Sequence, residues 1–76
     1  MLFKVFYQEN KNIAPRRENT HSMYVEVETD SVLEGTIKLR ELINTKTNYQ
    51  IEFMDALTAE AEAYERESDN FNLRTL

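Results

Sequence analysis

Alternation of apolar and polar residues predicts two strands in the first third of the chain, at residues 2–8 and 22–28. Phe3, Val5 and Tyr7 share one face of the first strand, and the face of the second strand that carries Met23, Val25 and Val27 is expected to point into the core. The opposite face of the first strand is mixed, which favours a central position in a sheet. The opposite face of the second strand, which carries Tyr24 and Glu26, is expected to face water. Because a polar loop at residues 9–20 connects them, the two strands are expected to pair antiparallel.

A main helix is predicted at residues 32–45. Ser31 and Glu34 form a capping box, in which Ser31 caps the helix and Glu34 reaches back to the Ser31 amide. The expected buried stripe comprises Val32, Thr36, Leu39 and Ile43, widened by Leu33, Ile37 and Leu42. Gly35 costs up to ~1 kcal/mol relative to Ala inside a helix. We therefore expect Gly35 to permit a close approach of the helix to the sheet.

Three shorter elements are expected in the second half of the chain: a strand at 49–54, a helix at about 59–67 and a last strand at 70–75. The third strand divides into a face with Tyr49, Ile51 and Phe53 and a face with Gln50, Glu52 and Met54. Thr58 is expected to cap the short helix. That helix would dock through Leu57, Ala61 and Tyr64, and the last strand would turn Phe71 and Leu73 inward.

This order of strand, strand, helix, strand, short helix and strand predicts an α+β fold. We expect a small, mostly antiparallel sheet of three to four strands with one main helix packed on it, in a single domain spanning residues 1–76. A ubiquitin-like β-grasp shares this order and is the alternative fold.

Composition narrows the classes of function. The 76 residues carry a net charge of -5, which argues against direct nucleic-acid binding, since that requires a basic patch. The absence of Cys excludes disulfides and thiolate metal sites and fits a reducing compartment. Lys4 interrupts the first apolar run, so a signal peptide is not expected, and no apolar run approaches the ~20 residues that span a bilayer. A cytoplasmic chain without membrane contact is therefore expected.

The residues that catalysis requires are scarce. The one histidine, His21, stands beside Ser22 on a predicted strand, where neighbours point to opposite faces and cannot form a nucleophile–base pair. A solitary Gly excludes a dinucleotide fingerprint or a P-loop, and no His pair is present for zinc. We therefore predict no catalytic residue, no metal and no cofactor, and a small hydrolase is the least supported class.

Several residues are candidates for binding a partner instead. Arg16 and Arg17 precede a strand and could hold a phosphate or carboxylate bidentately, or else pair with acidic groups of the same chain. Tyr7 and Tyr24 are either core residues with the hydroxyl at an edge or anchors of an interface. The acidic residues between 52 and 69 either solvate the chain or meet a basic surface.

Four ordered pieces of the chain resemble the small epsilon subunit of RNA polymerase from Gram-positive bacteria. These pieces are Met1–Glu9, Arg17–Glu26, Ile51–Met54 and Tyr64–Phe71. Together they extend over nearly the whole chain. The chain departs from the family pattern within residues 29–48, where the segment from Asp30 to Asn48 looks longer than usual.

The resemblance implies a non-catalytic accessory subunit of DNA-directed RNA polymerase, a nucleotidyltransferase complex. Such a subunit docks on the core enzyme at its large catalytic subunits, modulates transcription and is similar in fold to a small phage-encoded polymerase inhibitor. The contact surface is then expected to include Arg16, Arg17, Tyr24, Glu26 and Glu65. The isolated chain is expected to be monomeric. The alternative is an acidic, nucleic-acid-mimicking inhibitor or antitoxin-like protein that occupies a basic groove of another partner.

Overall fold

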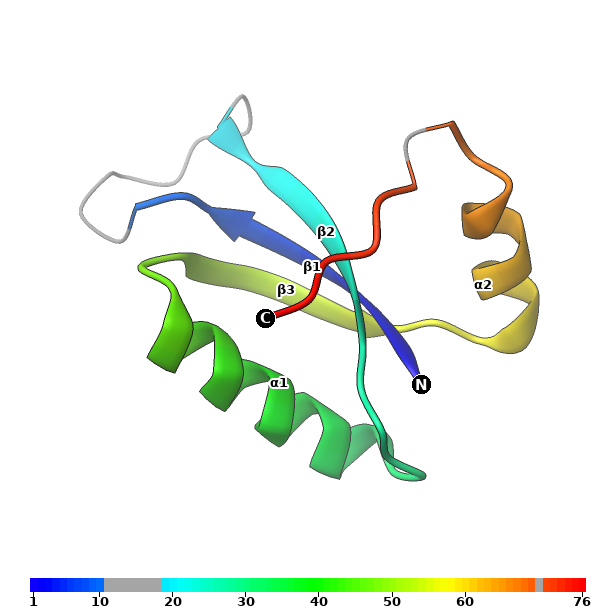
Figure 1. Cartoon of the computed structure of the whole chain (residues 1–76), viewed down its shortest axis with the longest axis horizontal. Helices are drawn as coiled ribbons and strands as arrows, with labels where there is room; N and C mark the ends of the chain where they lie inside the picture. The colour runs from blue at the N-terminus through cyan, green and yellow to red at the C-terminus, as the bar shows by residue number, and fades with distance from the viewer. Residues whose placement is uncertain (11–18, 70) are drawn as a thin grey trace.

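The computed structural model describes residues 1–10, 19–69 and 71–76. Within them the elements are, in chain order, β1 (Leu2–Gln8), β2 (His21–Glu26), α1 (Val32–Lys46), β3 (Gln50–Ala56) and α2 (Ala59–Arg66). This α+β order, which Figure 1 shows along the chain, is the predicted one from the first strand to the short helix. The strands form an antiparallel sheet in the order β2-β1-β3, so the expectation that β1 is central is confirmed.

The C-terminal segment runs beside β2 as a single bridge, where a strand at 70–75 was expected. Leu73 pairs in parallel with Tyr24, and the Arg74 N–H donates to the Tyr24 carbonyl at 2.8 Å. Leu73 remains 47% exposed, so the prediction that it turns inward is wrong. The segment covers the outer edge of β2 by its backbone.

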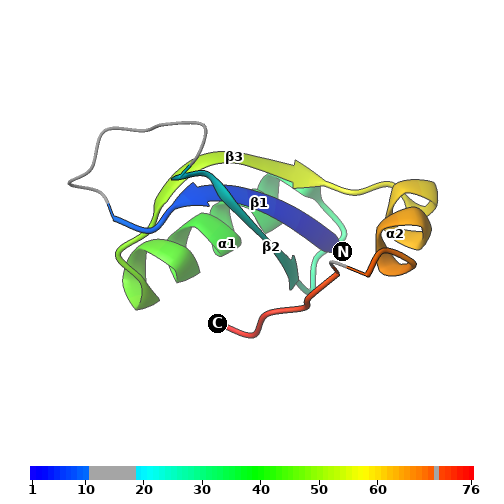
Figure 2. The same ribbon diagram turned by 90° about the horizontal axis from the view of Figure 1, so that it is seen from above.

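One face of the sheet carries α1 and the main core. The buried side chains of this core are Phe3, Val5, Tyr7, Met23, Val25, Val27, Leu39 and Ile43. The inward face predicted for β2 is thus confirmed, and in β1 the face of Phe3, Val5 and Tyr7 is the one in this core. Figure 2 shows α1 on one side of the sheet and α2 beyond one end of the strands.

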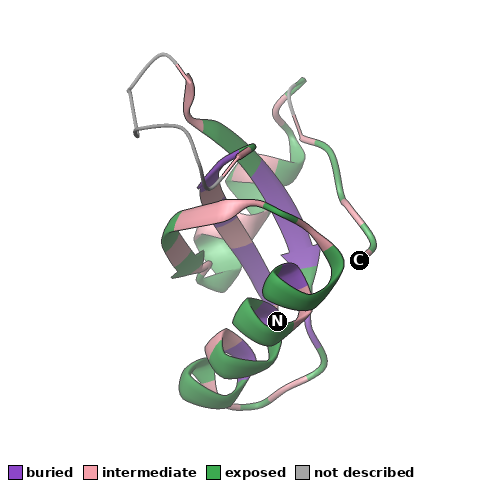
Figure 3. Cartoon of the chain, turned by 90° about the vertical axis from the view of Figure 1, so that its left-hand side faces the viewer, coloured by how far each residue is buried: buried purple, intermediate pink, exposed green. Residues whose placement is uncertain are grey.

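The helix meets the sheet along Gly35, Leu39 and Ile43. A Cβ on Gly35 would lie 2.7 Å from the Phe3 ring tip, which confirms that a glycine is needed for this close approach. Val32, which was expected in the buried stripe, is 55% exposed, because the helix contacts the sheet through the row of Gly35, Leu39 and Ile43 instead. Figure 3 shows buried residues mainly within the sheet and largely exposed helix surfaces, although β3 itself has no buried residue.

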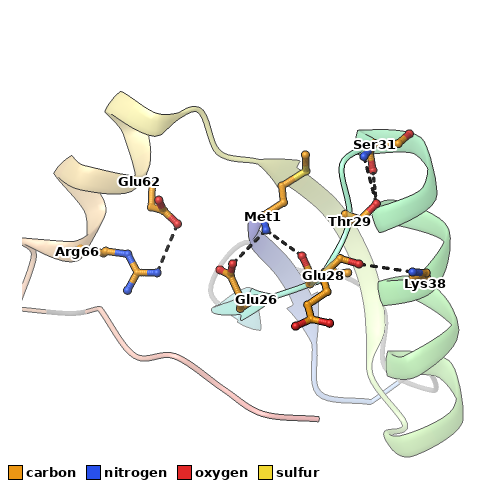
Figure 4. Close-up of polar contacts among 9 residues, drawn as sticks. Met1, Glu26, Glu28, Thr29, Ser31, Lys38, Glu62 and Arg66 are labelled. Atoms are coloured by element: carbon orange, nitrogen blue, oxygen red, sulfur yellow. Dashed lines mark hydrogen bonds and ion pairs between the residues drawn. The ribbon is translucent and has the colours of Figure 1, made fainter.

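Both helices begin at the predicted caps. Ser31 Oγ accepts from the Glu34 N–H at 3.3 Å, and Thr58 Oγ1 accepts from Ala61 at 3.1 Å. The reciprocal half of the capping box is replaced, because the Ser31 N–H donates to Thr29 Oγ1 at 3.1 Å (Figure 4).

The expected docking stripe of α2 is wrong at Tyr64. This side chain is 77% exposed, and α2 has no buried residue. Glu65, the next residue along the helix, makes the contacts with the sheet instead.

A register shift changes the faces of β3. Phe6 pairs with Phe53, but the next residue, Tyr7, pairs with Ile51, which leaves Glu52 as an extra residue of β3. Tyr49, Ile51, Met54 and Ala56 therefore pack on the core side. Phe53, predicted to share a face with Ile51, is 58% exposed on the other side beside Phe6.

Candidate interaction surface

The sheet face away from α1 carries a polar cluster that joins β1, β2 and α2. Glu65 accepts hydrogen bonds from Lys4 Nζ at 3.1 Å and from the Tyr24 hydroxyl at 2.7 Å. Lys4 Nζ also lies 5.4 Å from the ring centroids of both Phe6 and Tyr24. The cluster holds α2 against the sheet, although that helix buries no side chain of its own.

The hydrogen bonds of this cluster favour its ionised form. Donation from Tyr24, and then from Lys4, lowers the pKa of Glu65. Burial lowers the pKa of Lys4, but the hydrogen bonds to Glu65 and Tyr24 outweigh it, so the net shift is upward. Burial, followed by the bond to the carboxylate, raises the pKa of Tyr24. Glu65 is therefore an anion and Lys4 a cation at neutral pH.

Tyr24 does not face water as predicted. It is 5% exposed, because α2 and the C-terminal segment cover it, and the Phe71 ring centroid lies 4.8 Å from its own. Tyr7 is also buried; its ring stacks on Tyr49 at 4.3 Å, and its hydroxyl accepts from Arg74 at 3.1 Å. Both tyrosines are thus buried with a bonded hydroxyl, as in the first of the two predicted roles, Tyr7 in the main core and Tyr24 on the opposite face of the sheet.

Glu26, another candidate partner residue, lies apart from this cluster. Glu26 is exposed and accepts from the Met1 amine at 3.0 Å, and the same amine donates to the Val27 carbonyl (Figure 4). Arg16 and Arg17 lie outside the described residues. The structure therefore brings Tyr24 and Glu65 together and leaves Glu26 separate.

Sequence reasoning missed two cations that organise the surface. Lys4 had a local signal, since it is the one charge within the apolar β1 strand. Arg74 had none, because its partners Tyr7 and Tyr49 are 67 and 25 residues away along the chain.

A second surface lies between α1 and β3. A groove of about 780 Å³ runs along these elements. Its lining comprises Thr36, Arg40 and Asn44 of α1 together with Tyr49 and the β3 residues from Gln50 to Met54. The outer surface of α1 continues from it with the exposed side chains of Leu33 and Ile37.

Groups that catalysis or metal binding would use are dispersed in the described part of the chain. No cluster of three His, Cys, Asp or Glu side chains there is close enough to hold a metal ion. His21 pairs with Glu9 at 3.4 Å and lies against the Tyr7 ring. Neither helix of the described residues has the length and apolar character that spanning a membrane requires.

Comparison with known proteins decides the family. The model of a family described as RNA polymerase epsilon subunit matches residues 2–75. The chain belongs to this family. Three relatives named DNA-directed RNA polymerase subunit epsilon each match over 73 residues, which is 96% of both chains. They come from Streptococcus gordonii at 51% identity, Streptococcus sanguinis at 48% and Streptococcus equi subsp. zooepidemicus at 44%.

Membership of the epsilon family confirms the resemblance seen in the four sequence pieces. The match extends from β1 to the C-terminal segment, so the whole Lys4–Tyr24–Glu65 cluster lies within it. The expectation of a longer segment at residues 29–48 is wrong for these relatives. Coverage of 96% on both sides leaves no room for a sizeable insertion.

Proposed function

We propose that this chain is a non-catalytic accessory subunit of bacterial DNA-directed RNA polymerase, which binds the core enzyme in the cytoplasm and modulates transcription. One observation carries the proposal: over 96% of its length the chain is similar to chains named as epsilon subunits, at up to 51% identity among those compared. The acidic, nucleic-acid-mimicking inhibitor is not favoured, because these relatives are named as polymerase subunits.

A binding role is supported by the polar cluster on the sheet face away from α1, whose groups bond to one another. Lys4, Tyr24 and Glu65 bond to one another and hold α2 in place. A partner can therefore contact the surface of this cluster without breaking the hydrogen bonds between its charged groups. The net charge of -5 favours a protein surface with basic groups over the phosphates of nucleic acid.

Among the individual candidates, Arg16, Arg17 and Glu26 are proposed to contact the core directly. Glu65 is proposed to contribute through the face it shares with Lys4. Because Tyr24 is buried by the rest of the chain, it is proposed to hold Glu65 in position through their hydrogen bond.

The test is binding of the tagged chain to purified core polymerase, measured by surface plasmon resonance and supported by mass identification of partners captured from lysate. We expect saturable binding to the core and recovery of polymerase subunits. Capture of a different single partner, with no saturable binding to the core, would overturn the proposal.

A residue-level arm of the same experiment uses the paired arginines. Replacing Arg16 and Arg17 by Ala should weaken binding by about tenfold or more with unchanged melting, because truncating a desolvated interface Arg costs 2 kcal/mol or more. Lys11→Ala, which removes one positive charge from the same predicted loop, is the matched control. Equal binding by all variants would remove the arginines from the interface while leaving the subunit role intact.

A further inference from the structure

The two edge strands of the sheet differ in whether other parts of the chain cover their outer backbone groups. The outer edge of β2 is covered by the C-terminal segment, where Arg74 donates its N–H to the Tyr24 carbonyl. On its other side, β3 pairs with no strand among the described residues. An uncovered edge presents backbone donors and acceptors that another strand can bind.

The register identifies which groups of β3 face outward. The Leu57 N–H donates to the Leu2 carbonyl at 2.9 Å, which fixes the phase of the ladder between β1 and β3. Because bonded and non-bonded pairs alternate in antiparallel strands, Met54 and Ala56 direct their N–H and C=O groups away from β1. The same rule applied to β2 places Tyr24 outward, which is where Arg74 binds.

The groove beside this edge offers a positive charge. The Arg40 side chain is exposed and makes no hydrogen bond or ion pair with any described residue. Glu52, the acidic group that lines the groove, accepts hydrogen bonds from Gln8 at 3.2 Å and from Thr20 at 2.8 Å. Both donors are neutral, so Glu52 keeps its negative charge while these bonds hold its carboxylate, and Arg40 is the positively charged side chain of the groove lining.

Apolar surface lies on both sides of the same edge. Phe53 is exposed on the face away from α1, and Leu33 and Ile37 are exposed on the outer surface of α1. An added strand alternates its side chains between the two faces of the sheet. Its residues would thus meet Arg40 on one face and Phe53 on the other.

We propose that the groove between α1 and β3 binds an extended segment of a polymerase core subunit, which adds as a strand to the edge of β3 and places a carboxylate against Arg40. Backbone hydrogen bonds to the edge supply affinity, and the groove and Arg40 supply specificity. This inference rests on the proposed subunit function and adds to it the surface and the chemistry of the bound segment.

Amide hydrogen exchange tests the strand addition directly. The isotopically labelled chain is exchanged alone and in complex with core polymerase, quenched, and read residue by residue by NMR. We expect at least tenfold slower exchange at Met54 and Ala56 in the complex. Phe53 and Asp55, whose amides already face β1, are the internal control and should change much less. Protection confined to other segments would overturn the proposal.

Arg40→Gln tests the charge, with Lys46→Gln as the matched control. Lys46 is also exposed on α1 and has no hydrogen bond or ion pair among the described residues, but it lies outside the groove. Arg40→Gln should weaken core binding at least tenfold without lowering the melting temperature. Lys46→Gln should change binding less than threefold. Equal affinities for the two variants would refute the role of Arg40.

The outcomes separate this inference from the function on which it rests. If the wild-type chain does not bind the core, the proposed function fails. If it binds but Arg40→Gln binds equally well, only the groove assignment fails. If the free chain self-associates in sedimentation experiments and Arg40→Gln abolishes that association, a second copy occupies the groove and the proposal is wrong.

Discussion

A methyl group added at Gly35 tests the closest contact in the fold. The Cβ of an alanine at this position would lie 2.7 Å from Phe3 Cζ and 2.7 Å from Thr29 Cγ2. Favourable contact between carbon atoms begins at about 3.5 Å, so each neighbour would have to yield by roughly 0.8 Å. Phe3 is completely buried, and its ring is enclosed by the core.

Two effects of known size oppose each other in Gly35→Ala. Alanine is better than glycine in a helix interior by about 1 kcal/mol. Overpacking of a tight core costs about 1–3 kcal/mol, and two contacts this short favour the upper end. The expected net loss is about 2 kcal/mol, which corresponds to a fall of about 8–16 °C in Tm for a domain of this size.

Thermal unfolding followed by circular dichroism measures this change, and a double-mutant cycle assigns its cause. Phe3→Leu shortens the side chain that clashes, so Gly35→Ala should cost at least about 1 kcal/mol less in that background. Thr29→Ser relieves the second clash while keeping the hydroxyl that bonds Ser31. A gain of about 1 kcal/mol for Gly35→Ala in the wild-type chain would show that α1 does not pack this closely.

Three further changes test the surface and the core. Because hydrogen bonds, first that from Tyr24, lower the pKa of Glu65, its carboxylate stabilises the fold above the unfolded-state pKa of about 4.3. That contribution is lost as the pH falls through the depressed pKa of Glu65. Between pH 7 and pH 2.5 the Tm of the wild-type chain should therefore fall more steeply than that of Glu65→Gln. Parallel curves of Tm against pH would contradict this. Val25→Asp buries an unpaired charge and should abolish cooperative unfolding by circular dichroism, whereas unchanged melting would mean that the register of β2 is reversed. Arg74→Ala removes hydrogen bonds to two tyrosine hydroxyls and should lower Tm by about 4–8 °C, for a loss of about 1 kcal/mol; no change would show that the C-terminal segment is not held by this side chain.

Local patterns were sufficient to predict the three strands and two helices of this fold, but not the single bridge that stands in place of the expected last strand. The alternation in β1 and β2 and the caps at Ser31 and Thr58 depend on neighbours in sequence, and the structure confirms them. The bulge at Glu52 could not be read from alternation, because one extra residue leaves the composition of the strand unchanged while it moves Phe53 to the other face.

Tertiary cover explains why the polar face of β2 was predicted incorrectly. Tyr24 follows the alternation and does point away from the core. What buries it includes Glu65 of α2 and Phe71, which both lie more than 40 residues later in the chain. Its bond to Glu65 therefore has no signature in the neighbouring sequence, although both residues were named separately as candidates.

The errors in α1 carry information about function. A helix whose apolar residues serve only the core would turn all of them toward the sheet, but here Gly35 sets the contact and leaves Leu33 and Ile37 exposed. Leu33 and Ile37 lie one helical turn apart and give this side of α1 an exposed apolar surface. They continue from the groove that contains Arg40. The part of the helix that fails the prediction of a buried stripe thus adjoins the groove in which a segment of the polymerase core is proposed to bind.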